Sequence, residues 1–250
     1  LGEVPGAAAI TYSGEDYNFC ELRAELKARG HRFENHSDTE VVLRAYLEWG
    51  EGFVDHLNGM FAFALWDRRS QRLLLVRDRM GVKPLYYYPT ASGVIFGSEP
   101  KALLANTRVP RTVRADGLRE ILEMVKTPGH AVFDGMREVL PGELVRIDRH
   151  GVNRHRYWQL EAREHTHSLK RTIDHTRALL EDIVERQIIA DVPLGSLLSG
   201  GLDSSIITAL ASRKLLAKGQ DNIRSFSVDF LDHGNGFAGD AVRGTPDAPF

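Results

Sequence analysis

The residues whose types and spacing point most clearly to chemistry are Ser199, Gly200, Gly201, Asp203 and Ser204. An apolar run precedes them and apolar residues at helical spacing follow them, which predicts a buried strand of a parallel sheet, a glycine turn and a helix. Free backbone N–H groups and the positive end of the helix dipole favour an anion at such a turn. We therefore expect a phosphate-binding loop, with Asp203 and Ser204 as candidate helix caps.

Two other nucleotide-binding loops do not fit this segment. A Walker loop requires Gly-x-x-x-x-Gly-Lys-Ser/Thr and a dinucleotide fingerprint requires Gly-x-Gly-x-x-Gly, and the segment has neither spacing. It instead resembles the pyrophosphate loop of enzymes that split ATP into AMP and pyrophosphate. This resemblance implies that Ser199, Gly200, Gly201 and Ser204 hold pyrophosphate and that Asp203 lies near Mg²⁺. The alternative is an ordinary glycine-rich turn with a polar cap.

Length and composition bound the class of protein. The 250 residues are 42% hydrophobic, which is enough for one or two domains with a real core. A formal net charge of −2 gives no reason to expect nucleic acid or an anionic membrane as a partner. No apolar run approaches the length of about 18 residues that a membrane span needs. The single cysteine, Cys20, excludes an internal disulfide and suits a cytoplasmic location.

The first 160 residues are rich in short β-prone runs. Turn residues separate these runs, which cover residues 60–66, 72–76, 85–88, 94–96, 143–147 and 154–158. Helices are predicted over residues 17–29, 38–49 and 115–124. Because neighbouring runs lie close together in the sequence, we expect antiparallel sheets.

The second half has the pattern of a parallel α/β domain. Residues 161–168 are polar without periodicity and are predicted to form an interdomain linker. A long amphipathic helix over residues 169–190 follows, and the strand at 194–198, the phosphate loop, its helix and a strand at 223–228 come after it. This order requires a right-handed crossover and a parallel sheet. From residue 231 to residue 250 the sequence predicts a loop or an unfinished end.

Motifs in the first half resemble those of a known family. They are Tyr-Ser-Gly-Glu-Asp-Tyr-Asn at 12–18, Ser-Asp-Thr-Glu at 37–40, Leu-Asn-Gly-Met-Phe-Ala-Phe at 57–63, Arg-Asp-Arg-Met-Gly-Val-Lys-Pro-Leu-Tyr-Tyr at 77–87 and Ser-Glu-Pro-Lys-Ala-Leu at 98–103. Together they resemble the class II glutamine amidotransferase domain of glutamine-hydrolysing asparagine synthetases. The phosphate loop lies where that family's synthetase domain begins.

This resemblance implies a two-domain protein of the α/β and α+β classes. Residues 1–160 would form an αββα sandwich of antiparallel sheets, of the N-terminal-nucleophile hydrolase kind, which serves as the glutaminase domain. Residues 161–168 would be the linker. Residues 169–250 would begin a parallel-sheet domain of the adenine-nucleotide α-hydrolase kind, which serves as the ATP-pyrophosphatase or asparagine synthetase domain.

The family couples two reactions. An N-terminal cysteine attacks the side-chain amide of glutamine and releases ammonia, because a thiolate is an effective nucleophile at neutral pH. The synthetase domain uses ATP and Mg²⁺ to adenylate a carboxylate, aspartate in the type case, and ammonia then displaces AMP. The resemblance therefore implies synthesis of asparagine from aspartate through a β-aspartyl-AMP intermediate. A homodimer is compatible with it, and no nucleic acid or membrane partner is expected.

Four residues align with the family's glutamine site, and three of them match it. Gly14 and Glu15 match its Asn-Gly-Glu motif, and Asp38 matches the carboxylate that holds the α-ammonium of glutamine, for which an acid is the natural partner. Ser13 stands where the family has an Asn that joins the glycine N–H in the oxyanion hole, and loss of such a donor costs roughly 3 kcal/mol of transition-state stabilisation. The alternatives are a solvated loop acid at Glu15 and an acid in a capping box at Asp38.

The sequence begins at Leu1, shortly before these motifs. In the family the nucleophilic cysteine follows the initiator Met, so we expect this chain to lack it, to be truncated at both ends, and by itself neither to hydrolyse glutamine nor to make asparagine. Cys20 is expected to be a small buried residue of the first helix. Leu197 and Val228 match positions whose backbone groups contact adenine, and their side chains are predicted to lie in the strand core.

Two alternative functions remain open. One is a cyclase of the β-lactam synthetase kind, which keeps the pyrophosphate loop without the glutaminase cysteine. Retention of Gly14, Glu15 and Asp38 argues against it, because a disused glutaminase site has no need of two substrate-binding acids. The other is a nucleotide-binding protein that performs no chemistry.

His165 and His167 are the residues that could suggest a metal site. They are expected to be solvated, because no cysteine or carboxylate cluster near them has the spacing of metal ligands.

Overall fold

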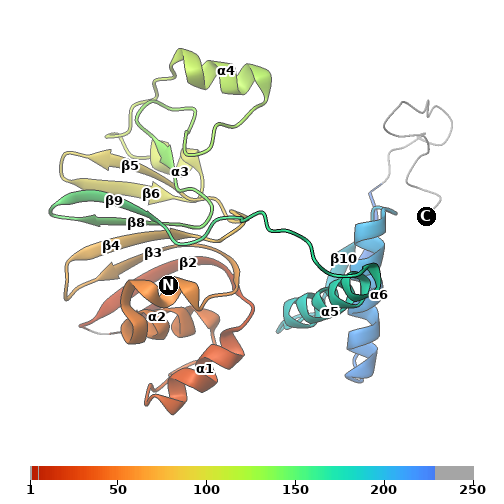
Figure 1. Cartoon of the computed structure of the whole chain (residues 1–250). Helices are drawn as coiled ribbons and strands as arrows, with labels where there is room; N and C mark the ends of the chain where they lie inside the picture. The colour runs from red at the N-terminus through yellow and green to blue at the C-terminus, as the bar shows by residue number, and fades with distance from the viewer. Residues whose placement is uncertain (1, 5, 229–250) are drawn as a thin grey trace. The chain divides into compact units, whose positions relative to one another are not determined.

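The computed structural model of the chain describes residues 2–4 and 6–228 (Figure 1). Contacts between residues divide the chain into two compact units, Leu1–Ala162 and Arg163–Phe250. We call them the first and the second unit. The loop predicted beyond residue 231 lies outside the described residues.

Two antiparallel sheets form the centre of the first unit. The larger sheet has the order β1-β2-β3-β4-β8-β9 and the smaller one the order β6-β5-β7, and every pairing in them is antiparallel, as predicted. The strands are β1 (Gly2–Val4), β2 (Ala8–Asp16), β3 (Gly59–Asp67), β4 (Arg72–Arg77), β5 (Tyr86–Thr90), β6 (Gly93–Gly97), β7 (Arg137–Glu138), β8 (Glu143–Asp148) and β9 (Gly151–Arg156).

Helices lie at both ends of this stack of sheets (Figure 1). At one end are α1 (Phe19–Ala28), α2 (Asp38–Trp49) and the 3₁₀ helix η1 (Gly50–Asp55), and at the other are α3 (Pro100–Leu104) and α4 (Ala115–Glu123). None of the helices in the described part of the chain is long and apolar enough to cross a membrane.

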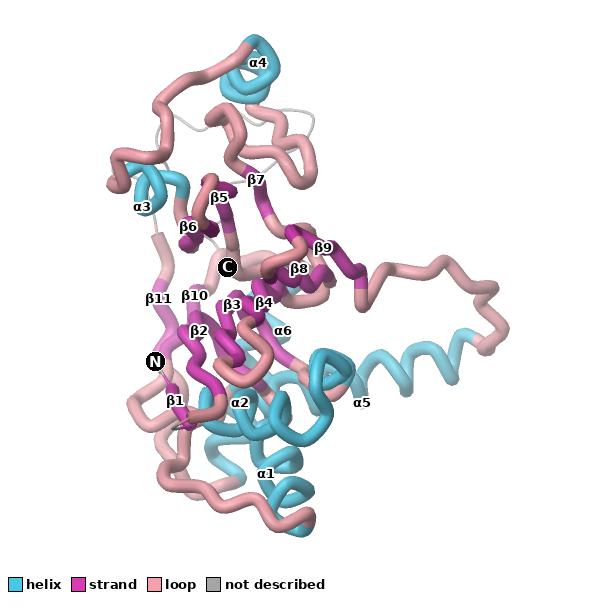
Figure 2. The backbone as a smooth tube through the Cα atoms, turned by 90° about the vertical axis from the view of Figure 1, so that its left-hand side faces the viewer, coloured by secondary structure: helices cyan, strands magenta, loops and turns pink. Residues whose placement is uncertain are grey.

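Figure 2 shows the backbone of the strands and helices of the first unit. The layers follow from the alternation of side chains between the two faces of each central strand. On β3, Phe61 packs with apolar residues of α1 and α2, whereas its neighbour Ala62 belongs to the core between the two sheets. On β5, Tyr87 joins the core between the sheets, and Tyr86 packs with Leu103 of α3. The order helix, sheet, sheet, helix confirms the predicted αββα sandwich.

The second unit contains two helices and a short parallel pair of strands. They are α5 (Leu169–Gln187), β10 (Gly195–Leu197), α6 (Leu202–Ala217) and β11 (Arg224–Phe226). Strands β10 and β11 run parallel, with Leu197 opposite Phe226, so the predicted parallel pairing is confirmed.

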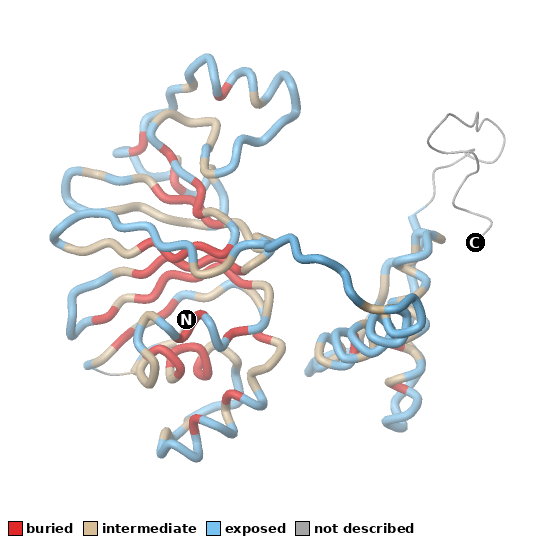
Figure 3. The backbone as a smooth tube through the Cα atoms, viewed as in Figure 1, coloured by how far each residue is buried: buried red, intermediate tan, exposed pale blue. Residues whose placement is uncertain are grey.

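The expectation that these strands are buried is wrong for the described residues. Leu197 is 77% exposed and Val228 is 84% exposed, and most of this unit is exposed (Figure 3). A parallel strand becomes buried when helices cover both faces of a sheet of several strands. The described residues of this unit supply two strands and two helices, which are too few to enclose a core.

Candidate functional site

The end of β2 carries three of the predicted site residues. Ser13, Gly14 and Glu15 pair with β3, where Gly14 lies opposite Phe61. Gly14 has a φ of +149°, and a Cβ atom there would lie 2.1 Å from the carbonyl oxygen of Met60. Only glycine therefore allows the two strands to approach at this point. Ser13 and Glu15 are exposed on the other face of the strand.

Asp38 is the first residue of α2 and is held against the end of β2. Its Oδ2 accepts a hydrogen bond from the backbone N–H of Asp16 at 3.0 Å, and its Oδ1 accepts one from the hydroxyl of Thr39 at 3.3 Å. The capping role belongs to Ser37, whose Oγ accepts a bond from the N–H of Glu40 at 3.3 Å. The carboxylate of Glu40 accepts bonds from the N–H groups of Glu34 and Asn35, so the predicted capping box is only half formed. Ser37 caps the helix, and Asp38 has no capping role.

Glu15, Asp38 and Lys83 share one electrostatic neighbourhood. The pKa of Glu15 is raised, first by burial and then by the negative charge of Asp38, and Lys83 opposes the increase. The loop that follows β4 thus brings a cation near Glu15, the more exposed of the two predicted site acids. A pair of acids near a single lysine favours a ligand that carries an ammonium group.

The loop at residues 78–83 is organised by Asp78, which is 1% exposed. Its Oδ1 accepts bonds from the N–H groups of Met80 at 3.1 Å and Val82 at 2.9 Å. Its Oδ2 accepts bonds from the N–H groups of Lys83 at 2.9 Å and Phe61 at 3.2 Å. One carboxylate therefore satisfies four backbone donors and fixes the backbone of Lys83 to β3.

Arg77 holds the same loop from the other side. Its Nε donates to the carbonyl of Lys83 at 2.8 Å and its Nη2 donates to the carbonyl of Gly81 at 2.8 Å. Its Nη1 donates to Oε1 of Glu138, also at 2.8 Å, and this pair is buried. Lys126 Nζ reaches the same Oε1 at 2.6 Å. From the sequence, Arg77 and Asp78 are recognised only as part of a family motif and of a turn. An Arg-Asp pair directly after an apolar strand is nevertheless a signal for buried polar contacts.

Cys20 is exposed, so the expectation that it is buried is wrong. Helix α1 buries Leu22 and Leu26. Because successive residues of a helix are about 100° apart, position 20 lies well away from the face that carries these two leucines.

The phosphate loop of the second unit has the predicted strand, turn and helix. Gly200 has a φ of +79°, and α6 begins directly after Gly201, which is its N-cap residue. Ser204 Oγ lies 3.0 Å from Ser199 Oγ, accepts a bond from the N–H of Ser199 at 3.3 Å and donates to the carbonyl of Gly201 at 3.1 Å. The predicted caps are therefore wrong, because Asp203 and Ser204 lie in the first turn.

This loop fits a phosphate group. The first backbone N–H groups of a helix have no carbonyl partner within the helix, and no side chain caps them in α6. Two serine hydroxyls flank these N–H groups. A Cβ atom placed on Gly201 would have Ser199 Oγ as its nearest neighbour among the described residues, at 3.5 Å, so space remains for a ligand to reach the N–H groups. Asp203 is exposed.

A protein-built metal centre is not found in the described residues. No group of three or more His, Cys, Asp or Glu side chains in this part of the chain could hold a metal ion. His165 is exposed and His167 is half-buried. Asp203 is thus the single acid that the phosphate loop itself could offer to a cation on bound phosphates.

Two family models match the chain, one in each unit. Residues 2–158 match the glutamine amidotransferase domain, and residues 175–250 match asparagine synthase. The chain belongs to the glutamine amidotransferase domain family. Its first unit is therefore a glutamine amidotransferase domain.

Several curated relatives share sequence similarity with most of this chain. Asparagine synthetase [glutamine-hydrolyzing] 3 of Bacillus subtilis is 44% identical over 96% of this chain and 40% of that protein. A putative asparagine synthetase [glutamine-hydrolyzing] of Mycobacterium tuberculosis is 36% identical over 84% of this chain and 34% of that protein. The chain thus spans two fifths or less of the length of these relatives.

Among solved structures, glutamine phosphoribosylpyrophosphate amidotransferase from B. subtilis matches 97% of this chain and 51% of its own. The sequence identity is 17% and the TM-score is 0.45.

Proposed function

We propose that the protein is an ATP-dependent, glutamine-hydrolysing amidotransferase that converts aspartate to asparagine. The observation that carries this proposal is the fixed carboxylate of Asp38 beside Glu15, in a unit that matches the glutamine amidotransferase domain. The phosphate loop in a unit that matches asparagine synthase supports the second half of the reaction.

In the first unit, Asp38 would bind the α-ammonium of glutamine. A carboxylate that is already fixed by an N–H bond loses little freedom when the ligand binds, which favours affinity. Glu15 would add negative charge next to it. The backbone N–H of Gly14 and the hydroxyl of Ser13 would stabilise the oxyanion that forms when a cysteine thiolate attacks the amide carbon. That attack transfers the acyl group to sulfur, and the C–N bond breaks as the amide nitrogen takes up a proton and leaves as ammonia. Water then hydrolyses the thioester to glutamate and regenerates the thiol.

In the second unit, the phosphate loop would hold the pyrophosphate portion of ATP. Ser199, Gly200, Gly201 and Ser204 would surround it, Asp203 would lie close to Mg²⁺ on the phosphates, and the backbone of Leu197 and Val228 would contact adenine. A carboxylate oxygen of aspartate attacks the α-phosphate and pyrophosphate leaves. Ammonia then attacks the acyl carbon of β-aspartyl-AMP, AMP leaves with the C–O electron pair, and one proton is released.

The role of Asp38 is tested with Asp38→Asn in the protein made from its complete reading frame. The variant keeps an oxygen for the Asp16 N–H but loses the charge, so we expect KM for glutamine to rise by about tenfold or more, while synthesis from free ammonia is unchanged. Asp116→Asn is the matched control, because Asp116 is an exposed acid in the first turn of α4. An unchanged KM in Asp38→Asn would remove Asp38 from the glutamine site.

The role of Ser13 is tested by Ser13→Asn in the same protein. The longer amide side chain would supply an oxyanion donor, so we expect a higher kcat for glutamine hydrolysis at similar KM. If kcat does not increase, position 13 does not limit the rate.

The nucleophile is tested by the mass and N-terminal sequence of that protein. A mature chain that begins with Cys supports glutamine-driven amidation. Any other first residue excludes the proposed glutaminase reaction and favours an ammonia-dependent synthetase or a cyclase.

A further inference from the structure

Asp16 is a buried acid to which the proposed mechanism assigns no role. It is the last residue of β2 and is 2% exposed. Its Oδ1 accepts a hydrogen bond from the N–H of Asn58 at 3.0 Å, but its Oδ2 is buried and has no partner among the described residues. Charged side chains are rarely buried in this way unless they are paired, so such a group calls for an explanation.

Asp16 is directly connected to Asp38 of the proposed glutamine site. Its own N–H donates to Oδ2 of Asp38 at 3.0 Å. It also shares one face of β2 with Tyr12, whose hydroxyl is likewise buried without a partner among the described residues. Gly14 lies between them on this face and has no side chain. The side of β2 that faces the helices therefore carries two unsatisfied polar groups close to the site acid.

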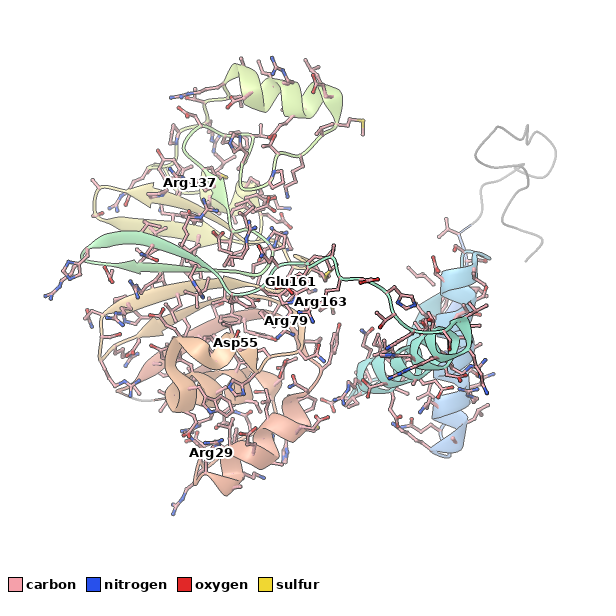
Figure 4. The ribbon with its side chains drawn as sticks, in the orientation of Figure 1. Arg29, Asp55, Arg79, Arg137, Glu161 and Arg163 are labelled. Atoms are coloured by element: carbon pink, nitrogen blue, oxygen red, sulfur yellow. The ribbon has the colours of Figure 1, made fainter. Side chains whose placement is uncertain are left out.

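The charges around Asp16 are mostly negative. Burial is the largest cause that raises the pKa of Asp16, to about 7, and the N–H of Asn58 lowers it. Asp38 from α2 and Glu21 from α1 raise it further, and Arg79, from the loop after β4, lowers it. Arg79 is itself held near Asp55, since its Nη2 donates to the carbonyl of Asp55 at 3.2 Å (Figure 4).

We propose that Asp16 is a positioning residue for Asp38. Once the carboxyl group of Asp16 has lost its proton, its negative charge next to Asp38 makes the site bind the ammonium of glutamine more tightly. This inference rests on the proposed function of Asp38. An ammonium held by Asp38 is attracted by a second carboxylate behind it, and by linkage the bound ammonium favours the ionised form of Asp16. Asp16 itself is too buried to touch the substrate.

The test compares the wild type with Asp16→Asn in the protein made from its complete reading frame. Asparagine keeps the shape of the side chain and the acceptor for the N–H of Asn58, but it does not ionise. We measure the Kd for L-glutamine by calorimetry between about pH 5.5 and about pH 8.5. We expect the wild type to bind about fivefold or more tightly at the upper end, and the variant to show a flat profile. A steep profile in Asp16→Asn would overturn the proposal.

A second readout does not depend on glutamine. Infrared spectra with ¹³C-labelled aspartate should show a protonated carboxyl band that is missing in Asp16→Asn and disappears in the wild type as the pH rises through neutrality. Loss of this band at the ordinary pKa of an aspartate would overturn the proposal.

Two further measurements separate the possible failures. Asp55→Asn removes an exposed acid and should keep the wild-type profile of Kd against pH; a flat profile in this control would mean that general charge is responsible and would overturn the proposal. If neither the wild type nor Asp16→Asn binds glutamine at any pH, the proposed function of Asp38 fails together with this inference. If glutamine binds but its Kd has the same pH dependence in both proteins, only the inference fails.

Discussion

Replacing Asp78 with Ala should destabilise the first unit far more than an ordinary turn substitution. The carboxylate of Asp78 accepts four backbone hydrogen bonds and is 1% exposed. Without it, the N–H of Phe61 on β3 and three N–H groups of the loop after β4 lose their acceptor. At about 1 kcal/mol for each bond, the loss is about 4 kcal/mol, and this is a low estimate because the acceptor is charged.

The matched control is Asp148→Ala at the last residue of β8, directly before the turn that leads to β9. Asp148 also accepts a bond from the chain two residues later, from the N–H of His150 at 2.8 Å, but this turn is more exposed. We expect a loss of about 1 kcal/mol or less there. The two variants therefore compare the loss of a buried carboxylate that accepts four backbone hydrogen bonds with the loss of a carboxylate that accepts one.

The assay is urea denaturation followed by tryptophan fluorescence. All three tryptophans of the chain, Trp49, Trp66 and Trp158, lie in the first unit, so the signal reports its unfolding. Asp78→Ala should lower the free energy of unfolding by about 4 kcal/mol with little change in the slope against urea. A loss no larger than that of Asp148→Ala would refute the view that this carboxylate organises the loop that carries Lys83.

Three further predictions follow from the same geometry. Gly14→Ala places a Cβ 2.1 Å from the carbonyl oxygen of Met60, so we expect a loss of about 3 kcal/mol or more in urea denaturation. The folded pKa of Asp16 is about 7 against an ordinary value of 3.8, so its contribution to stability is fully present below about pH 4 and is lost as the pH rises towards 7. Asp16→Asn should abolish this loss, which is at most about 4 kcal/mol, in unfolding curves measured at several pH values. Ser204→Ala removes the hydroxyl that meets Ser199, and ATP affinity should fall about tenfold in a nucleotide-binding titration, with glutamine hydrolysis unchanged.

The layers of the first unit could largely be predicted from the sequence. Short apolar, β-prone runs marked β3 and β4. A capping box followed by apolar residues at helical spacing predicted residues 38–49, the span that α2 occupies. Strand β2 is not predicted, because its last residues form the polar motif Ser-Gly-Glu-Asp, which resembles a loop. Its strand character depends on pairing with β3, which is distant in the sequence.

The organisation of the proposed glutamine site was only partly predictable. Family motifs pointed to Gly14, Glu15 and Asp38 as its residues, but the buried contacts of Arg77 and Asp78 depend on tertiary structure. The burial of Asp16 is equally hidden from sequence reasoning, since a polar residue in a motif is normally expected to be exposed.

In the second unit, apolar content predicted more burial than the described residues show. A pattern of hydrophobic residues indicates which face will be covered, but it does not supply the elements that cover it. Leu197 is apolar at a strand position, and its exposure follows from the small number of strands and helices around it.

The most direct test of the central proposal follows the amide nitrogen of glutamine. The protein made from its complete reading frame is incubated with [amide-¹⁵N]glutamine, aspartate, Mg²⁺ and ATP, and the products are analysed by mass spectrometry. We predict ¹⁵N-labelled asparagine, AMP and pyrophosphate in equal amounts, with glutamate formed alongside. AMP without labelled asparagine, or glutamate without AMP in the presence of aspartate, would contradict the proposal that one protein uses glutamine nitrogen to amidate an adenylated carboxylate.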